Sequence, residues 1–468
     1  MSLVPEPLRL RSARGRIALA ATVLSSGMVF LDSTVVNVAL PTVGRDLGSD
    51  VTGLQWIVNG YMLTLSALLL LGGALGDRLG RRRMLLLGLA GFALASVLCG
   101  VAPSEGTLIA ARFGQGVGGA LLVPASLAII EASFHPDDRA RAIGLWSGLA
   151  GIAAALGPFL AGWLIEVVSW RAAFLINVPL ALVAAWAARR IPETRGGTGR
   201  LDIGGAIAAG AGLASAAWCL TEAGRRGAGD PAIVASAAAA VVLLAAFVGI
   251  ERRAPNPLVP GEVARSPAFR ATNAITLFAY ASLTGMFFLL PTELQIGLGL
   301  SPLEAGAALM PVTLVMLVVS PRAARVSDLI GPRLPLALGL GVACSGLLAL
   351  SRASPGDRYL TGVLPGVLLF AFGISFCVAP LTVTMMASVA RERAGVASAI
   401  NNAVSRVAGL LAVATLPLAA GIAGSDYRDP TRFTHGYERA LEICAVSFAV
   451  AMVIALVGFR TRASAVGG

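Results

Sequence analysis

The sequence predicts an all-α polytopic membrane protein that crosses the bilayer about fourteen times. Hydrophobic residues make up 56% of its 468 residues, charged residues make up only 13%, and the mean hydropathy is +0.81. A soluble protein needs about 25% charged residues to cover its surface. Because this chain has far fewer, most of its outer surface must face lipid.

Apolar runs of spanning length follow one another along the chain, separated by short polar loops. A spanning helix needs about 20 mainly apolar residues to cross a lipid core about 30 Å thick. The first run follows four arginines, but its length and its lack of a small-residue cleavage site favour a spanning helix over a signal peptide. The runs lie near residues 17–40, 55–75, 84–102, 107–130, 142–165, 172–188, 203–221, 232–250, 271–291, 304–320, 334–350, 362–387, 396–421 and 440–459.

The residue types exclude several classes of function. All 36 basic residues are arginine, so the chain has neither a Walker A lysine nor a Schiff-base lysine. The five cysteines lie in apolar runs without a C-x-x-C spacing, and there are only two histidines, so neither a disulfide framework nor a metal site is expected. The arginines are scattered among loops, which argues against a nucleic-acid-binding face. No catalytic constellation is visible, and no cofactor is expected.

The arginines also predict the orientation of the chain. The tails and loops on the side of the two termini carry 25 arginines, whereas the opposite loops carry 9. Because arginine and lysine concentrate in cytoplasmic loops, both termini are expected in the cytoplasm.

An internal repeat predicts two related halves. The loop after the second run contains Gly73, Asp77, Arg78 and Gly80, followed by Arg81 and Arg82. The loop after the tenth run repeats the Asp-x-x-Gly spacing with Asp328 and Gly331. Two homologous halves joined by extra helices are typical of transporters. We therefore expect a six-helix half at residues 1–200, a two-helix insert at 201–253 and a second six-helix half at 254–468.

Asp32 and Arg112 are charged residues within predicted spans. A charge at the bilayer centre costs about 2.5–3.5 kcal/mol on insertion scales, so each needs a reason to be there. Both lie at a similar depth from the outer ends of their spans, which predicts that they pair. Burial favours a neutral carboxyl group and a nearby guanidinium favours a charged one. Displacing Arg112 would therefore make Asp32 take up a proton; the alternative is a static ion pair that joins two helices.

Two other charges are candidates for function. Glu293 follows a proline beneath a polar and aromatic stripe that includes Tyr280 and Phe287, so it is a candidate second acidic site. Arg406 shares its span with Asn401. These two side chains either line a cavity or join helices through hydrogen bonds.

The fifth run contains Gly148, Gly157, Pro158 and Gly162. Small residues allow close helix contact in lipid, and a proline introduces a bend that packing can satisfy. This stretch predicts either a rigid bend used in a rocking motion or a packing motif without such a role.

Together these motifs resemble the major facilitator superfamily, and within it the fourteen-helix drug:proton antiporter branch. The Gly73–Arg82 loop is similar to the superfamily's cytoplasmic signature loop, and residues 31–41, which include Asp32, resemble the first-helix motif of that branch. Residues 112–116, with Arg112 and Gln115, resemble the fourth-helix motif. The Gly157-Pro158 stretch resembles the antiporter motif, with Ala153 and Ala161 where glycine is usual. The resemblance extends from about residue 28 to residue 410.

This resemblance implies a monomeric, proton-coupled exporter of hydrophobic or cationic small molecules in the inner membrane of a bacterium. Asp32 would alternate between proton and substrate, and Asp77 with Arg81 and Arg82 would gate the cytoplasmic side. The substrate cavity would include Asn37, Tyr280, Phe287, Asn401 and Arg406. An exporter of one metabolite or natural product is the alternative within the same fold. A membrane scaffold or sensor predicts extra soluble domains, which the short loops do not contain.

Overall fold

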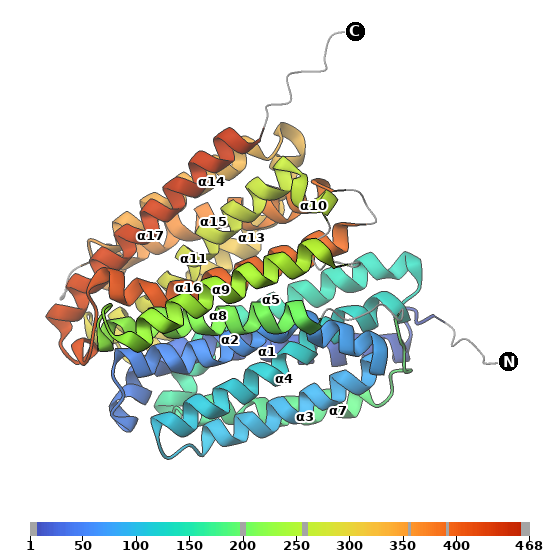
Figure 1. Cartoon of the computed structure of the whole chain (residues 1–468), viewed down its shortest axis with the longest axis horizontal. Coiled ribbons are helices and arrows are strands. Elements are labelled where there is room, and N and C mark those ends of the chain that lie inside the picture. The colour runs from blue at the N-terminus through green and yellow to red at the C-terminus, as the bar shows by residue number, and fades with distance from the viewer. Residues whose placement is uncertain (1–6, 197–202, 255–260, 354–356, 390–392, 460–468) are drawn as a thin grey trace, which may run out of the picture. The chain divides into compact units, whose positions relative to one another are not determined.

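The computed structural model is almost entirely helical (Figure 1). It describes residues 7–196, 203–254, 261–353, 357–389 and 393–459. Within these ranges the only β-type pairing is an isolated bridge between Leu8 and Phe134. In a membrane, helices are favoured because each satisfies its own backbone hydrogen bonds.

The helices follow the predicted apolar runs along the whole chain. The first group is α1 (Ala13–Leu47), α2 (Val51–Leu79), α3 (Arg81–Gly100), α4 (Glu105–Ser133), α5 (Pro136–Val167), α6 (Ala172–Leu175) and α7 (Asn177–Ala188). Next come α8 (Ile203–Arg226) and α9 (Pro231–Arg253). The last group is α10 (Gly261–Arg265), α11 (Pro267–Ile296), α12 (Pro302–Ala308), α13 (Met310–Ile330), α14 (Arg333–Leu350), the π-helix η1 (Tyr359–Val363), α15 (Leu364–Ala387), α16 (Ala394–Ala420), the 3₁₀-helix η3 (Asp426–Arg428) and α17 (Pro430–Gly458).

Twelve helices of the described chain are long and apolar enough to cross a membrane, and a bent pair within α2 raises the number to thirteen. The remaining predicted run, Ala172–Ala188, is a shorter apolar helix. The fold is therefore that of a polytopic membrane protein with about twelve to thirteen candidate spans. The first and last helices also extend beyond their apolar runs, to Leu47 and from Pro430 respectively.

Local sequence signals explain where many helices begin. Ser104 and Ser301 each form a capping box, in which the serine accepts from a backbone N–H three residues later and that residue's side chain accepts in return. Proline occupies the first turn of α5, α11 and α17. This position suits proline because its missing N–H has no partner within the helix.

The chain divides into two compact units. Unit 1 comprises Met1–Ser49, Gly53–Ala216 and Val234–Asn256, and unit 2 comprises Asp50–Thr52, Ala217–Ile233 and Pro257–Gly468. The chain passes from one unit to the other within α8 and again within α9. The expected boundary at residue 200 lies outside the described residues, and the division into two halves and an insert stays a prediction.

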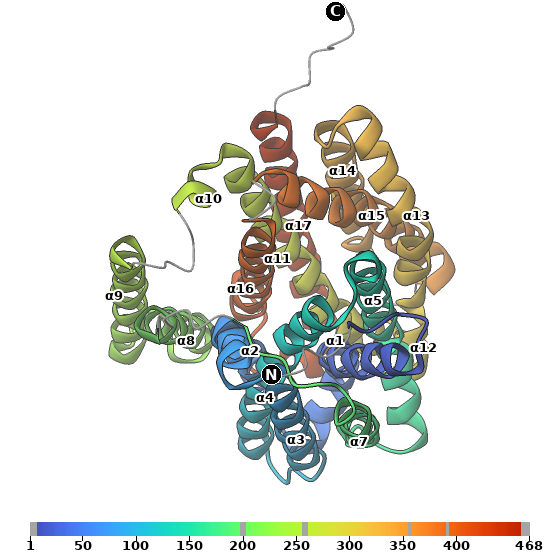
Figure 2. The ribbon, with the colours of Figure 1, turned by 90° about the vertical axis from the view of Figure 1, so that its right-hand side faces the viewer.

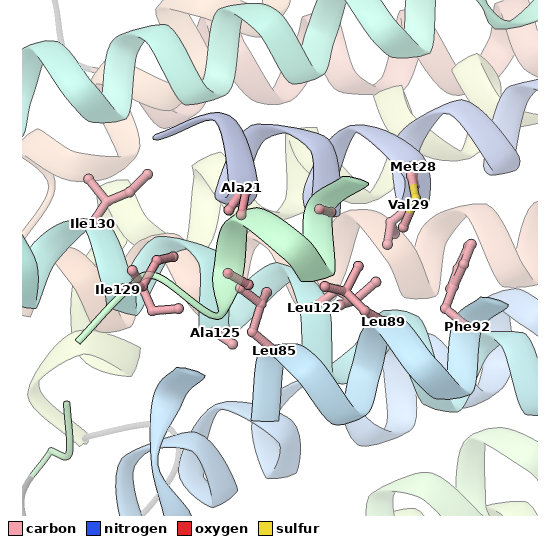
Figure 3. Packing of buried hydrophobic residues seen from close by; sticks show 14 of the residues in the cluster. Ala21, Met28, Val29, Leu85, Leu89, Phe92, Leu122, Ala125, Ile129 and Ile130 are labelled. Atoms are coloured by element: carbon pink, nitrogen blue, oxygen red, sulfur yellow. The ribbon is translucent and has the colours of Figure 1, made fainter. Parts of the chain in front are cut away.

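Unit 1 has a continuous apolar core between α1, α3, α4 and α7. Met28 of α1, Leu89 and Phe92 of α3, and Leu122 of α4 are almost completely buried in it (Figure 3). Burying one such side chain contributes about 1.5–3 kcal/mol in water-soluble proteins; between membrane helices, close packing has the larger part. This core holds α1 and α4 in place, and these two helices carry the polar residues described below.

Units 1 and 2 each contain a close contact between two helices that depends on a glycine. A Cβ atom at Gly118 of α4 would lie 2.7 Å from the backbone nitrogen of Phe92 in α3. In unit 2, a Cβ atom at Gly346 of α14 would lie 2.4 Å from the backbone nitrogen of Phe370 in α15. Glycine is therefore needed at both places, because the neighbouring backbone occupies the space of a side chain. The contacting pairs α3–α4 and α14–α15 are both seen in Figure 2.

The loop that is repeated in the sequence also has a glycine with positive φ at the same position in both copies. Gly80 lies between α2 and α3 with a φ of 112°, and Gly331 lies between α13 and α14 with a φ of 83°. Both values fall in the region that glycine alone adopts readily. The Asp-x-x-Gly spacing of the sequence thus corresponds to the same kind of turn in each half.

Candidate functional site: a buried ion pair and its partners

Asp32 lies in the middle of α1, and residues beside it in the helix pack against apolar side chains of other helices. Leu31 and Val35 belong to a small core cluster with Ala161 of α5 and Ala173 of α6. Only 1% of the Asp32 side chain is exposed. A carboxylate in such surroundings is costly unless it is paired and hydrogen-bonded.

The partner of Asp32 is Arg112 of α4, as the sequence predicts. Nη1 of Arg112 lies 2.5 Å from Oδ2 of Asp32, and the Arg112 side chain is also only 1% exposed. Nε of Arg112 donates to the backbone oxygen of Ile57 at 2.9 Å. The guanidinium carbon lies 4.3 Å from the ring centroid of Tyr61 and 5.8 Å from that of Phe174. Aromatic faces attract a cation, so both rings stabilise the buried charge.

Neutral side chains complete the coordination of the ion pair. Nε2 of Gln115 donates to Oδ1 of Asp32 at 2.8 Å and to Ser96 at 2.9 Å, while its Oε1 accepts from Nη1 of Arg112 at 2.7 Å. Nδ2 of Asn177 donates to the same Oδ1 of Asp32 at 3.1 Å. Gln115, Ser96 and Asn177 are fully buried. We refer to Asp32, Arg112, Gln115, Asn177 and Ser96 as the Asp32 network.

The Asp32 network joins five helices of unit 1. Its members come from α1, α3, α4 and α7, and the Ile57 carbonyl comes from α2. A protonated Asp32 would no longer attract Arg112 as an anion, and one of its oxygens would become a donor. A single proton therefore changes the attraction between helices at their point of convergence. The described residues contain no group of histidine, cysteine and acidic side chains that would hold a metal ion.

A second charged cluster lies where α2 turns into α3. Arg81 donates through Nε to Oδ1 of Asp77 at 2.9 Å and through Nη1 to the Ala128 carbonyl of α4 at 3.1 Å. Arg78 is exposed, whereas Gly73 packs against Pro124, to which a Cβ atom at residue 73 would lie 3.3 Å distant. The arrangement ties the end of α2 to both α3 and α4.

Glu193 belongs to this second cluster, although no motif in the sequence points to it. Its carboxylate accepts from the backbone N–H groups of Arg82 at 2.9 Å and Arg83 at 3.2 Å. The Glu193 side chain thereby satisfies the free amides at the start of α3, where negative charge is also favoured by the helix dipole. Nη1 of Arg82 donates to the Ile191 carbonyl at 3.0 Å. We call Asp77, Arg81, Arg82 and Glu193 the Gly80 cluster.

The sequence gives one weak signal for Glu193. It is one of only two acidic residues, with Asp202, in a loop that carries Arg189, Arg190, Arg195 and Arg200. Nothing in the sequence shows that this loop returns to α3, which it does through a hydrogen bond from the Arg81 N–H to the Thr194 carbonyl at 3.0 Å.

The corresponding turn of unit 2 has no equivalent of the Gly80 cluster among the described residues. Asp328 is exposed and makes no ion pair with a described residue. A Cβ atom at Gly331 would have no neighbour within 4 Å, whereas a Cβ atom at Gly80 would lie 2.7 Å from the Glu193 carboxyl carbon. The second turn therefore repeats the backbone of the first but not its ion pairs.

Glu293 is a buried acid near the end of α11 in unit 2, and only 1% of it is exposed. Its Oε1 accepts from the Thr434 hydroxyl of α17 at 2.8 Å. Its Oε2 and the hydroxyl of the neighbouring Tyr437 are buried and have no hydrogen-bond partner among the described residues. Gly297 leaves space for the acid, because a Cβ atom there would lie 2.0 Å from Oε1. An incompletely satisfied buried acid calls for a functional explanation or a bound water molecule.

The glycines predicted in α5 differ in their surroundings. Gly157, Pro158 and Gly162 are buried, whereas Gly148 is exposed and a Cβ atom there would have no neighbour within 4 Å. A Cβ atom at Gly157 would lie 2.0 Å from Oγ1 of Thr34 in α1. Thr34 in turn donates to the Ala154 carbonyl at 2.9 Å. Gly157 therefore permits a close contact between α5 and α1, and α5 continues through Pro158.

The remaining predicted residues are divided between the units. In unit 1, Asn37 is buried, and its Oδ1 has no hydrogen-bond partner within the described part of the chain. In unit 2, Nδ2 of Asn401 donates to Thr276 at 2.7 Å and to Asn273 at 3.3 Å, which joins α16 to α11. Tyr280, Phe287 and Arg406 are partly exposed. Asn401 thus acts as a link between helices in this structure.

Comparison with known proteins gives consistent matches over most of the chain. Residues 22–413 match the family model described as Major Facilitator Superfamily. The puromycin resistance protein pur8 of Streptomyces alboniger is 39% identical over 395 residues, covering 83% of this chain and 78% of that protein. The cephamycin export protein CmcT of Amycolatopsis lactamdurans is 36% identical over 416 residues, covering 87% of this chain and 86% of that protein.

Solved structures share the fold at low sequence identity. A bacterial homologue of the human lysosomal transporter Spinster, in an inward-facing and unoccupied conformation, is similar with a TM-score of 0.70 and 17% identity. The two chains are covered to 96% and 97%. The xylose transporter XylE of E. coli, in an inward-open conformation, has a TM-score of 0.65 and 14% identity, with coverage of 97% and 98%.

Proposed function

Because the chain belongs to the Major Facilitator Superfamily, we propose that it is a proton-coupled secondary transporter that exports hydrophobic or cationic small molecules by alternating access. The observation that carries this proposal is the buried ion pair of Asp32 and Arg112, at 2.5 Å within unit 1. An ionisable pair inside a spanning segment marks an ion or substrate pathway by default. The names of similar proteins, including puromycin resistance and multidrug resistance, support an efflux role.

The proposal includes a topology and a location. The chain would cross the inner membrane of a bacterium fourteen times, with Ala172–Ala188 as the shortest span and both termini in the cytoplasm. It would act as a monomer and not as an enzyme, on protons and a small-molecule substrate within the lipid bilayer. Residues 1–200 and 254–468 would form the two six-helix halves, with residues 201–253 as the insert.

The proposed coupling step occurs at Asp32. A proton that binds Asp32 converts the carboxylate into a neutral acid, so Arg112 loses its anionic partner within the protein. The remaining contacts of Arg112, to the Ile57 carbonyl and to Gln115, are weaker than the charged pair. The helices that meet at the network are then free to separate, and release of the proton restores the attraction. A cationic substrate would compete with the proton for the same carboxylate.

Alternating access also requires that one end of the transporter opens and closes. We propose that the Gly80 cluster, together with Arg78 and Gly73, is part of the gate on the cytoplasmic side. Asp77 and Arg81 form an ion pair at 2.8 Å that is only partly buried, so it is able to break and reform in contact with water. Asp328 is the corresponding acid of the second half, and its exposed carboxylate is available to a partner in another conformation.

Glu293 is proposed as a second proton-coupling residue. Its unpartnered Oε2 is available to a proton or a water molecule, and Thr434 holds the other oxygen in place. The polar stripe beneath it includes Tyr280, and Phe287 lies on the same helix. These two residues, with Asn37, Asn401 and Arg406, are our candidates for the substrate cavity. The α5 motif of Gly157, Pro158 and Gly162 would provide a rigid bend that suits a rocking motion, with the exposed Gly148 as a further member of the motif.

A narrower substrate range is the second candidate function. The similarity to a cephamycin export protein and to a tetracenomycin C resistance and export protein favours an exporter of one natural product. The two proposals share the fold and the coupling step, and they differ only in the breadth of substrates.

Efflux in inverted membrane vesicles tests the proposal. Proton-driven ethidium transport is compared between the native chain, Asp32→Asn and the control Asp46→Asn. Asp46 is an acid of the same helix that pairs with Arg171 at 2.8 Å, but its side chain is 46% exposed. We expect transport that collapses with the proton gradient, is lost in Asp32→Asn and persists in Asp46→Asn.

Other outcomes separate the alternatives. Unchanged transport in Asp32→Asn would contradict the coupling role of Asp32, and Glu293→Gln is then tested in the same assay. Transport of cephamycin-like or puromycin-like compounds without transport of ethidium would select the narrow exporter. Transport that is insensitive to the proton gradient would contradict proton coupling.

A further inference from the structure

Two neighbouring helices of unit 1 expose apolar stripes that end in arginines. On α3 the exposed side chains include Leu87, Leu94 and Leu98, at 52%, 63% and 50%, and Arg83 precedes them by one turn. On α7 they include Leu182 and Trp186, at 67% and 57%, and Arg190 follows by one turn. Residues three or four apart lie on one face of a helix, so each arginine lies at the end of its stripe.

The two stripes end at the same level of the structure. Helices α3 and α7 are in contact with each other. The Arg82 guanidinium donates to the Ile191 carbonyl at 3.0 Å, and the Arg81 N–H donates to the Thr194 carbonyl at 3.0 Å. The start of α3 and the residues that follow α7 are therefore held together.

The arginines at this level have no acidic partner among the described residues. Arg83, Arg189 and Arg190 are exposed, and none of their guanidinium groups makes an ion pair with a described residue. Glu193 is the nearest acid in the sequence to Arg189 and Arg190, but its carboxylate is already bonded to the backbone amides of Arg82 and Arg83. Asp77, the nearest acid to Arg83, is bonded to Arg81. Three positive charges are thus left uncompensated beside two apolar stripes.

Trp186 gives this surface a fixed geometry. The guanidinium carbon of Arg190 lies 3.5 Å from the centroid of the Trp186 ring, and its Nη1 donates to the Trp186 carbonyl at 3.0 Å. Tryptophan is favoured at the level of lipid headgroups, where its ring is apolar and its N–H is polar. A guanidinium held on the ring keeps other N–H groups for a phosphate oxygen, which arginine binds in a bidentate manner.

We propose that Arg83, Arg189, Arg190 and Trp186 form a binding site for the headgroup of an anionic phospholipid, whose acyl chains lie along the stripes of α3 and α7. The charge selects an anionic lipid over a zwitterionic one, which brings its own ammonium group. The stripes select a lipid over a free phosphate ion, because only a lipid covers them. This site lies beside the Gly80 cluster, and its occupation does not depend on which substrate is transported.

The test is lipid retention by the purified protein in native mass spectrometry. Phosphatidylglycerol or phosphatidylcholine is added to the native chain, to Arg83→Gln/Arg189→Gln/Arg190→Gln and to Arg252→Gln/Arg253→Gln. The last variant is a control at another place, where two charges are removed, since Arg252 and Arg253 are exposed arginines in the final turn of α9. We expect the native chain and the control to retain phosphatidylglycerol, and the triple variant to retain at least about fivefold less, because each arginine near an anionic lipid adds to the attraction.

Two further measurements test the lipid site without relying on the triple variant. Trp186→Leu preserves all three positive charges and removes the ring on which Arg190 stacks. This variant should retain an amount of phosphatidylglycerol between those of the native chain and the triple variant. It also provides a test if the triple variant does not fold. Thermal unfolding should shift upward with phosphatidylglycerol but not with inorganic phosphate. Equal retention by the native and triple variants, equal loss in the control, equal retention of phosphatidylcholine, or an equal shift with phosphate would each overturn the proposal.

Discussion

Gln115 Nε2 lies 2.8 Å from the Oδ1 atom of Asp32, the oxygen opposite the one that Arg112 binds. The amide oxygen of the same Gln115 accepts from Arg112 at 2.7 Å. A carboxamide has both a donor and an acceptor, so this residue contacts both members of the ion pair at once. Gln115 is therefore a positioning residue for Asp32 and Arg112.

Replacing Gln115 tests this role. Gln115→Leu leaves Ser96 and Oδ1 of Asp32 with one partner fewer, and an unsatisfied buried polar group costs about 1–3 kcal/mol. We expect a lower midpoint of thermal unfolding and slower proton-driven efflux in vesicles. Gln115→Glu is the comparison, because it adds a negative charge beside Asp32 and should impair efflux more. Native efflux in both variants would show that Gln115 does not position the pair.

A double-mutant cycle measures the interaction free energy between Asp32 and Arg112. Removing one partner of a buried ion pair costs about 3–5 kcal/mol, because the other charge is left uncompensated. We expect Asp32→Asn and Arg112→Gln each to lower the free energy of unfolding, and the double variant to lower it by less than the sum. The measurement is thermal or chemical unfolding of the purified protein in detergent. Additive effects would mean that the two side chains do not interact in the native protein.

Glu193 is expected to stabilise the start of α3. Glu193→Ala removes the acceptor for the amides of Arg82 and Arg83, and loss of a helix cap costs about 0.5–2 kcal/mol. Unfolding of the variant should occur at a lower temperature. Glu262→Gln is a suitable control, because the Glu262 side chain is 83% exposed and its contact to Arg393 is 3.9 Å long. A control that unfolds as early as the variant would contradict a specific role for Glu193.

Gly80 and Gly331, two of the positive-φ glycines, occupy corresponding turns and can be compared directly. An alanine at Gly331 meets only the backbone strain of its φ of 83°, which costs about 1–3 kcal/mol. An alanine at Gly80 meets similar strain and also collides with Glu193. Gly80→Ala should therefore be more destabilising than Gly331→Ala, and it alone should be partly rescued by Glu193→Ala. The same thermal unfolding assay compares all of these variants.

The glycines of α5 give another comparison. Gly157→Ala places a methyl group 2.0 Å from Oγ1 of Thr34, and overpacking of this kind costs about 1–3 kcal/mol. Gly148→Ala enters open space and should leave stability unchanged or raise it, since alanine favours a helix over glycine by about 1 kcal/mol. Efflux and unfolding are measured for both. A similar loss in the two variants would contradict the close contact of α5 with α1.

The helices and the central ion pair were predictable from the sequence for a physical reason. A run of apolar residues in lipid must satisfy its own backbone, so each predicted run coincides with helical structure. Asp32 and Arg112 were predictable as partners because a buried charge needs a counter-charge. Gln115 was predicted only as a member of the motif at residues 112–116, and its contact with Asp32 was not predicted.

Other members of the site were not predictable from the sequence. Asn177 and Ser96 are neutral, and a neutral polar residue in a span is as often a link between helices as part of a site. Glu193 lies in a loop whose course the sequence does not determine. The hydrogen bond from Thr434 to Glu293 joins residues far apart in the chain, and no periodic pattern indicates their contact.

The turns at Gly80 and Gly331 have a consequence for engineering. Both copies preserve a backbone that only glycine adopts readily, but the charged side chains around them have diverged. The copies therefore differ in the charged side chains around the turn and in the loop after α7, which brings Glu193 to the first turn. An acidic side chain placed within reach of the backbone amides at the start of α14 would give the second turn the helix-capping contact that Glu193 gives the first.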